Sequence, residues 1–195
     1  MKTRFDESYW DERYRNGATG WDLGEVSPPL KDYFDQLIDR KSNILIPGAG
    51  SGYEAGYLWN LGFINTHILD ISRTALANFT STFDAFPREK IHHDDFWDHT
   101  GQYDLIVEQT FFCAIDPKLR EAYAEKVHSL LADKGKLVGL VWSQEMGVDS
   151  PPFGGSIVEY QLLFEELFTI DTMEVAFNSI PLRSGKELFI KLTRK

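Results

Sequence analysis

Three glycines alternate with other residues directly after a short apolar run, and this pattern limits the folds available to the chain. The run is Asn43–Pro47, and the glycines that follow are Gly48, Gly50 and Gly52. In α/β folds a buried strand that leads through glycines into a helix is a common ligand site, because glycine accepts positive φ and lets a ligand approach the backbone. On spacing alone, a tight strand-to-helix turn without a ligand remains an alternative.

After the glycines, short apolar runs alternate with segments of helical period. Further strands are expected at Phe63–Leu69, Lys90–His92, Tyr103–Glu108 and Lys136–Trp142, and at about 169–177 and 186–193. Helices are expected after Gly52, after Ser72 as N-cap, after Asp116-Pro117 and over 156–168. Apolar strands that alternate with helices are typical of a parallel sheet covered on both faces, and two final strands without a helix between them favour an antiparallel edge. The prediction is an α/β protein, a three-layer αβα sandwich with a mostly parallel, seven-stranded sheet.

Length and charge narrow the class of protein. The 195 residues, 43% hydrophobic and 26% charged, suit a single domain over 1–195, with residues 1–30 forming an aromatic, turn-rich arm. A formal net charge of −10 repels phosphate backbones and anionic lipids, so neither nucleic acid nor membrane is expected as a partner. No signal peptide and no stretch near the ~18 apolar residues of a membrane span is present, so a soluble, cytoplasmic protein is expected. The sequence does not indicate the oligomeric state, and a monomer is compatible with it.

The acidic residue at the end of the second predicted strand separates two cofactor hypotheses. A dinucleotide fingerprint requires a third glycine where this chain has Tyr53, which disfavours an NAD-dependent oxidoreductase. The observed spacing followed by Asp70 instead suits S-adenosylmethionine, because a carboxylate there can accept both ribose hydroxyls. Asp70 is not needed as a helix cap, since Ser72 fills that place.

A second acidic position follows the third predicted strand. Asp95 could accept from the adenine amino group while Phe96 covers the ring, and the neighbouring Asp94 is its competitor for that role. A solvated acidic turn beside a buried phenylalanine is the structural alternative.

Several segments together resemble the class I S-adenosylmethionine-dependent methyltransferases. They are Leu45-Ile46-Pro47-Gly48-Ala49-Gly50-Ser51-Gly52, Leu69-Asp70-Ile71-Ser72, Asp95-Phe96, Tyr103-Asp104-Leu105-Ile106 and Leu130-Leu131-x-x-x-Gly135-x-Leu137. Three more segments resemble the thiopurine methyltransferase family on its halide/thiol methyltransferase side: Trp10-Asp11-x-Arg13-Tyr14-x-x-Gly17-x-x-Gly20-Trp21-Asp22, Phe111-Phe112-Cys113-Ala114-Ile115 and Pro151-Pro152-Phe153-Gly154-Gly155. The resemblance covers nearly the whole chain. It implies a Rossmann-like methyltransferase fold, S-adenosylmethionine as cofactor and S-adenosylhomocysteine as product.

The resemblance also implies roles for single residues. Trp10, Tyr14 and Trp21 would form an aromatic lid over the cofactor, whose sulfonium has no hydrogen-bond donor and is held by ring faces at ~0.5–2 kcal/mol each. Gln109 stands where relatives contact the cofactor, and Ile46 is apolar where most class I enzymes are acidic. The predicted cofactor residues are Trp10, Tyr14, Trp21, Gly48, Gly50, Gly52, Asp70, Ile71, Asp95, Phe96 and Gln109.

The predicted acceptor pocket is apolar and has no general base. Its candidates are Phe111, Phe112, Trp142, Phe153 and Arg183. Each phenylalanine could equally be core, and Arg183 could attract an anion or be a solvated turn arginine. Cys113 is interpreted as a buried small hydrophobe, and His92, His93 and His99 as solvated histidines, because their spacing matches no zinc pattern.

These observations predict an S-adenosylmethionine-dependent methyltransferase acting on a small soft nucleophile, namely a thiol or hydrosulfide, a halide or a thiopurine. A soft nucleophile needs alignment and exclusion of water more than a base, which fits a chain without a Ser-His-Asp or Cys-His arrangement. The alternative from another class is a regulatory protein that binds the cofactor without catalysis.

Overall fold

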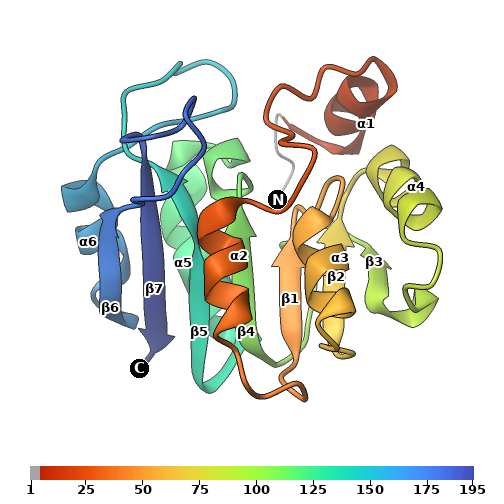
Figure 1. Cartoon of the computed structure of the whole chain (residues 1–195). Helices are drawn as coiled ribbons and strands as arrows, with labels where there is room; N and C mark the ends of the chain where they lie inside the picture. The colour runs from red at the N-terminus through yellow and green to blue at the C-terminus, as the bar shows by residue number, and fades with distance from the viewer. Residues whose placement is uncertain (1–4) are drawn as a thin grey trace.

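The chain alternates strands and helices and then ends in two strands, as Figure 1 shows for the computed structural model, which describes residues 5–195. The helices are α1 (Glu7–Arg15), α2 (Pro28–Asp35), α3 (Tyr53–Asn60), α4 (Arg73–Thr82), α5 (Arg120–Leu130) and α6 (Ile157–Phe164). The strands are β1 (Ile44–Pro47), β2 (Thr66–Asp70), β3 (Ile91–His93), β4 (Tyr103–Gln109), β5 (Leu131–Trp142), β6 (Phe168–Val175) and β7 (Glu187–Arg194). Residues 1–4 of the predicted arm and of the predicted domain lie outside the described residues.

The seven strands form one sheet in the order β3-β2-β1-β4-β5-β7-β6. Strands β1 to β5 pair in parallel, whereas β7 runs antiparallel to both β5 and β6. The predicted α/β sandwich with an antiparallel edge is therefore confirmed. Because β1 to β5 all end at the same edge, drawn uppermost in Figure 1, the loops that follow them meet there.

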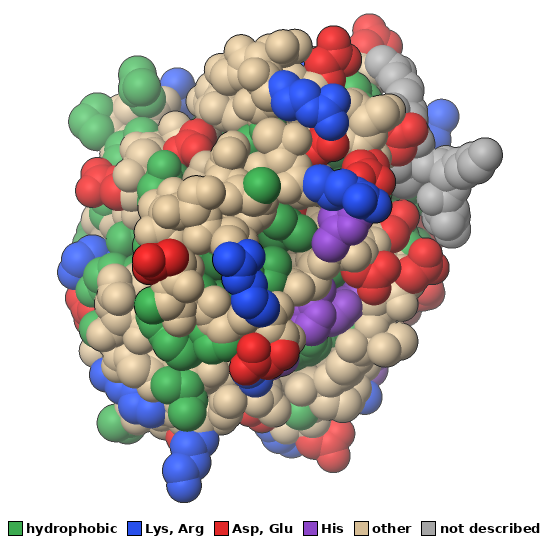
Figure 2. Space-filling view, turned by 90° about the vertical axis from the view of Figure 1, so that its right-hand side faces the viewer, with side chains coloured by type: hydrophobic (Ala, Val, Ile, Leu, Met, Phe, Trp, Pro, Cys, Tyr) green, Lys and Arg blue, Asp and Glu red, His purple; other side chains and the backbone are tan. Residues whose placement is uncertain are grey.

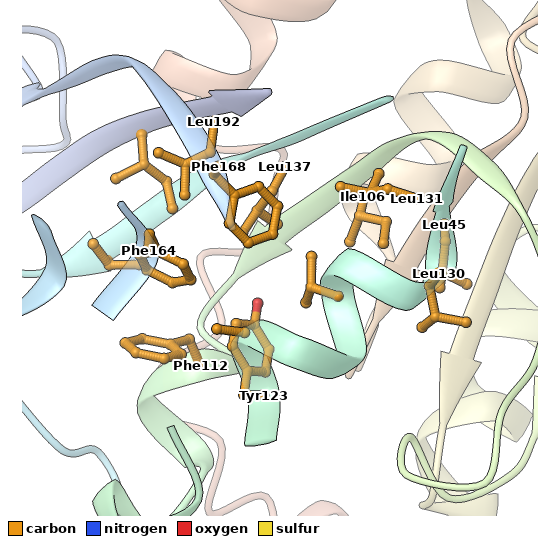
Figure 3. Packing of buried hydrophobic residues seen from close by; sticks show 14 of the residues in the cluster. Leu45, Ile106, Phe112, Tyr123, Leu130, Leu131, Leu137, Phe164, Phe168 and Leu192 are labelled. Carbon is orange, nitrogen blue, oxygen red and sulfur yellow. The ribbon is translucent and has the colours of Figure 1, made fainter. Parts of the chain in front are cut away.

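Helices cover both faces of the sheet, and each face has its own apolar core. Helices α2, α3 and α4 pack on one face, with Phe34, Leu58 and Phe79 fully buried beneath them. Helices α5 and α6 cover the other face, where the rings of Tyr123 and Phe112 have their centroids 5.0 Å apart. Figure 3 shows these two side chains next to each other. Burying one such side chain stabilises the fold by about 1.5–3 kcal/mol, so these two layers fix the sheet that carries the upper edge.

Within its described part, the predicted turn-rich arm contains helix α1 and the first residues of helix α2. Asp6 caps α1 by accepting from the Tyr9 backbone N–H at 3.1 Å. Pro28 begins α2, whose first turn needs no backbone donor at that position. The observed bounds differ most from the predicted ones at β5, which starts at Leu131 rather than at residue 136, and at α6, which ends at Phe164 rather than at residue 168. Strand β2 starts at Thr66 rather than at Phe63.

Candidate active site

The loops at the upper edge enclose a cavity of about 700 Å³. The predicted site residues that line it are Trp10, Tyr14, Trp21, Gly48, Asp70, Ile71, Asp95, Phe96, Phe111, Trp142 and Arg183. A smaller cavity of about 40 Å³ runs along the glycine turn and is lined by three more of them, Gly50, Gly52 and Gln109. The two cavities share Tyr14, Trp21 and Gly48 in their walls, so they are neighbouring parts of one site.

The turn after β1 requires glycine for both conformation and space. Gly48 and Gly50 have φ of +58° and +55°, which side chains rarely adopt. A Cβ atom on Gly48 would lie 2.2 Å from the Phe111 ring, and one on Gly50 would lie 2.5 Å from the Tyr14 hydroxyl. The close packing of Phe111 and Tyr14 over this turn therefore depends on the missing side chains.

Asp70 ends β2 inside the site and is held by two backbone donors. One carboxylate oxygen accepts from the Gly50 N–H and the other from the Ser72 N–H, both at 2.8 Å. The Ser72 hydroxyl caps α4 by accepting from the Ala75 N–H, so Asp70 is free of that task. Burial raises the pKa of Asp70 to about 6, and the two N–H donors oppose that rise. A carboxylate has about four acceptor positions, so two remain for the hydroxyls of a ribose.

The aromatic arm residues form one continuous wall of the cavity. The Trp21 ring stands edge-on to both Trp10 and Tyr14, with centroid distances of 5.7 and 5.9 Å. Helix α1 is fixed over the start of α4 by Asp11, which accepts from the Ser72 hydroxyl at 2.6 Å. The arm is thereby tied to the same serine whose backbone N–H holds Asp70.

The acidic turn after β3 brings both candidate carboxylates to the cavity wall. Asp95 accepts from the Trp97 N–H and Asp94 from the Asp95 N–H, each at 3.0 Å. Phe96 is buried and packs edge-on against the Phe111 ring with centroids 5.1 Å apart. The choice between Asp94 and Asp95 as the adenine ligand stays a prediction.

The end of β4 carries a buried carboxylate that sequence reasoning missed. Glu108 accepts from the Phe111 and Phe112 N–H groups at 2.8 and 2.7 Å and from the Tyr123 hydroxyl at 2.9 Å. Burial raises its pKa to about 7. The sequence signal that could have identified Glu108 is an acidic residue in the last position of an apolar predicted strand. Glu108 fixes the turn that places Phe111 on the cavity wall.

Gln109, the last residue of β4, leaves an acceptor open. Its side-chain oxygen is buried and, within residues 5–195, has no hydrogen-bond partner. A buried acceptor without a donor is costly, and Gln109 is one of the residues that line the small cavity. Together with Asp70 and the aromatic wall, this orphaned acceptor fits a ligand that carries hydroxyl groups, an aromatic base and an ammonium group, as S-adenosylmethionine does.

Arg183 lines the far end of the large cavity, beside Trp142. Its guanidinium lies 5.3 Å from the Trp142 ring centroid and donates to Glu187 at 3.1 Å and to the Trp21 carbonyl at 2.5 Å. The alternative of a solvated turn arginine is wrong, because Arg183 is only 5% exposed.

Two predicted pocket residues do not reach the cavity. Phe112 is 1% exposed and packs between Tyr123 and Tyr160 in the core. Phe153 is 3% exposed, and its backbone N–H donates to the Cys113 carbonyl at 2.7 Å. Both are core residues, so the prediction that they line the pocket is wrong. Cys113 is buried as expected and touches the cavity wall, and burial raises its thiol pKa to about 12.

The interpretation of the histidines as solvated is wrong for two of the three. His99 is buried and bonds to the Tyr103 hydroxyl at 2.8 Å. The His92 ring stacks on His67, with their nitrogens 2.9 Å apart. His93 is exposed and contacts the Ile71 carbonyl at 3.1 Å. Within residues 5–195 no group of three His, Cys, Asp or Glu residues is arranged to hold a metal ion.

Comparisons with known proteins agree with this geometry. The sequence model of the family described as thiopurine S-methyltransferase matches residues 5–187. A probable thiol methyltransferase 2 of Arabidopsis thaliana is 31% identical over 174 residues, which are 83% of this chain and 76% of that protein. Thiocyanate methyltransferase 1 of the same plant is 29% identical over 188 residues, 93% of this chain and 82% of that protein.

Among solved structures, a Burkholderia thailandensis 1,6-didemethyltoxoflavin-N1-methyltransferase with bound S-adenosylhomocysteine superimposes with a TM-score of 0.80. The match covers 97% of this chain and 87% of that one at 15% identity, and it shows the shared fold. No helix within residues 5–195 has both the length and the apolar character needed to cross a membrane.

Proposed function

Since this chain belongs to the thiopurine S-methyltransferase family, we propose that it transfers a methyl group from S-adenosylmethionine to a small soft nucleophile. The acceptor class comprises a thiol or hydrosulfide, a halide, or a thiopurine, and relatives are named for thiols and for thiocyanate. The observation that carries the proposal is one cavity that joins Asp70 at the end of β2 to Trp142 at the end of β5. A cytoplasmic location and the lack of nucleic-acid or membrane partners stay predictions.

The order of the strands sets the layout of this site. Strands β1 and β4 lie between β2 and β5, so Asp70 and Trp142 are three strand spacings, or roughly 14 Å, apart along the sheet edge. That length suits an adenosyl group whose ribose lies at Asp70 and whose sulfur lies over β1 and β4. The acceptor then approaches from the side of Trp142 and Phe111.

The cofactor supplies an activated methyl group on a sulfonium, and methyl transfer is an in-line displacement. A lone pair of the acceptor forms the new bond to the methyl carbon while the bond from that carbon to the sulfonium breaks, so S-adenosylhomocysteine leaves as a neutral sulfide. Trp10, Tyr14 and Trp21 exclude water and present ring faces to the positive charge. Alignment of the two reactants within such a closed site can supply about 7–11 kcal/mol of the barrier.

The side chains at the acceptor end favour an anionic or easily ionised nucleophile. Phe111 and Trp142 provide apolar walls, and the buried Arg183 guanidinium, which is ion-paired with Glu187, lies beside them. A hydrosulfide or halide ion needs no base, and a thiol of near-neutral pKa loses its proton to solvent before it binds. The proposed mechanism therefore assigns no general base to the chain.

The first experiment is thermal unfolding with S-adenosylmethionine or S-adenosylhomocysteine, and with NADH as the control. At 100 times its dissociation constant a ligand stabilises by about 2.7 kcal/mol, which raises Tm by roughly 5–11 °C for a domain of this size. Methyl transfer to hydrosulfide, thiocyanate, iodide and a thiopurine is then measured. Stabilisation followed by transfer to none of these would favour a binding protein without catalysis, and no stabilisation would contradict the proposal.

A further inference from the structure

The arm brings a carboxylate to the glycine turn that the mechanism above does not use. Asp22 follows Trp21 directly and lines both the large and the small cavity. One of its oxygens accepts from the Gly24 N–H at 2.7 Å, and the other accepts from the Ser51 hydroxyl. Asp22 is thus held in place against the glycine turn, with acceptor positions to spare.

The small cavity that Asp22 lines is rich in acceptors. Gln109, whose side-chain oxygen is buried without a partner, is another of its lining residues, and so is Glu54, a buried carboxylate whose oxygen accepts from the Ser27 N–H at 3.2 Å. Burial is the main cause that raises the pKa of Glu54, and the negative charge of Asp22 adds to it. The volume of about 40 Å³ is close to that of one water molecule, so a small polar group fits there. Negatively charged hydrogen-bond acceptors around so small a space favour the binding of a cation that has several N–H donors.

The end of β1 does not offer a negative charge for such a cation. Ile46 is buried and apolar, so a carboxylate near the glycine turn has to come from another part of the chain. We propose that Asp22 binds the α-ammonium group of the methionine part of S-adenosylmethionine and S-adenosylhomocysteine. This inference rests on the proposed function and assigns the arm a binding role besides that of an aromatic lid.

A purely structural role for Asp22 makes a different prediction. If Asp22 served only to tie the arm to Ser51, its loss would loosen the arm and weaken every ligand that the arm covers. A ligand that lacks the ammonium group separates the two roles. Methylthioadenosine is such a ligand, because it keeps the adenosine and the sulfur but has no amino-acid part.

The test is calorimetric titration of the full chain with S-adenosylhomocysteine and with methylthioadenosine. Asp22→Asn keeps the size of the side chain and removes its charge, and it should weaken S-adenosylhomocysteine at least tenfold while leaving methylthioadenosine within about twofold. Ser51→Ala removes the tie but keeps the charge, so it should change the two affinities by the same factor. Glu12→Gln removes an exposed charge of the same arm as a matched control, and both affinities should stay unchanged.

Three outcomes decide the proposal. Equal weakening of both ligands by Asp22→Asn would overturn it in favour of the structural role, and so would unchanged binding of S-adenosylhomocysteine. Selective loss also in Glu12→Gln would assign the effect to overall charge and would overturn it as well. Failure of the unmodified protein to bind either ligand would instead contradict the proposed function.

Discussion

At the scale of single residues, two buried carboxylates at the upper edge share an elevated pKa but face different surroundings. Asp70 accepts only from two backbone N–H groups and lines the cavity. Glu108 accepts from two backbone N–H groups and from Tyr123, and it faces the core. The first therefore has acceptor positions left for a ligand, whereas the second supports the turn beneath the pocket.

The pH dependence of cofactor affinity should follow Asp70. Its pKa of about 6 in the free protein means that ligand hydroxyls, which donate to the charged form, bind best above pH 6. We expect the affinity for S-adenosylhomocysteine to fall about tenfold per pH unit below pH 6 and to be flat above pH 7. Titration calorimetry from pH 5 to 8 measures this, with Asp70→Asn as the variant that should bind weakly and without that dependence. An unmodified protein whose affinity stayed constant down to pH 5 would remove Asp70 from the ribose site.

The stability of the fold should depend on the charge of Glu108. Its folded pKa of about 7 lies above the ordinary 4.5, so stability from this group is present below pH 4.5 and is lost as pH rises to 7. Glu108→Gln keeps a side-chain oxygen for the two N–H groups and carries no charge. Its free energy of unfolding relative to that of the unmodified protein should therefore rise by about 3 kcal/mol from pH 5 to pH 8. Urea unfolding of both proteins at several pH values gives the difference, and parallel pH profiles would contradict it.

At the scale of elements, helix α1 is placed by polar contacts. Asp11 is only 4% exposed and accepts from the Ser72 hydroxyl and the Thr74 N–H, which are groups of the first turn of α4. Figure 1 shows α1 standing above the end of the sheet on the side of α4. Helix α1 and the Asp70 site are therefore connected through one capping residue, Ser72.

Loss of Asp11 should free the whole of helix α1 from helix α4. Asp11→Ala leaves two donors at the start of α4 without their partner, and we expect about tenfold weaker binding of both S-adenosylhomocysteine and methylthioadenosine. This equal loss differs from the selective loss expected for Asp22→Asn. Trypsin should also cut faster after Arg15, which loses its 2.8 Å ion pair with Asp11. The control is Arg73→Ala, which removes an exposed ion pair of α1 with α4 and should change little. Unchanged trypsin sensitivity in Asp11→Ala would show that Asp11 does not hold the helix.

The elements that sequence could predict are those whose signals are local. The apolar run before Gly48 and the end of β2 at Asp70 follow from burial and spacing within a few residues. Helix α2 also had a local signal, the serine and prolines at 27–29. Helix α1 packs by polar contacts, so its sequence has no apolar stripe from which it could be predicted. Phe111 and Phe112 are neighbours of one type, and only the turn fixed by Glu108 decides which of them faces the cavity. The burial of Arg183 depends on the Trp21 carbonyl, which is too distant in sequence to be inferred.

At the scale of the whole molecule, the net charge of the chain is negative, like that of the anionic acceptors expected for it, so the two repel each other. The formal net charge is −10, and Figure 2 shows acidic, basic and histidine side chains interspersed on the face that carries β3 and α4. Within the described part of the cavity wall, Arg183 is a buried cation beside Trp142. Because Arg183 is ion-paired with Glu187, it acts on an anion at short range only, whereas the net charge repels the anion at long range.

Ionic strength should separate these two effects. Salt screens distant charges first, since the Debye length falls from about 30 Å at 0.01 M to about 8 Å at 0.15 M. We expect kcat/KM for hydrosulfide to rise over this range and kcat/KM for a neutral acceptor to stay constant. Steady-state rates in a salt whose anion is not an acceptor provide the measurement. A fall for hydrosulfide would mean that the local field of Arg183 outweighs the net charge.

Strand β7 lies between β5 and β6 in the sheet, although it is the last strand in the chain. On the ribosome, β5 and β6 therefore emerge before the strand that joins them, and the neighbouring edge of β5 stays open until residues 187–194 are made. Arg183, just before that strand, also donates to the Trp21 carbonyl and so ties the first part of the chain to the last. Completion of the sheet thus waits for the synthesis of β7, and a nascent chain stalled before β7 would carry an unpaired, apolar strand edge for chaperones to protect.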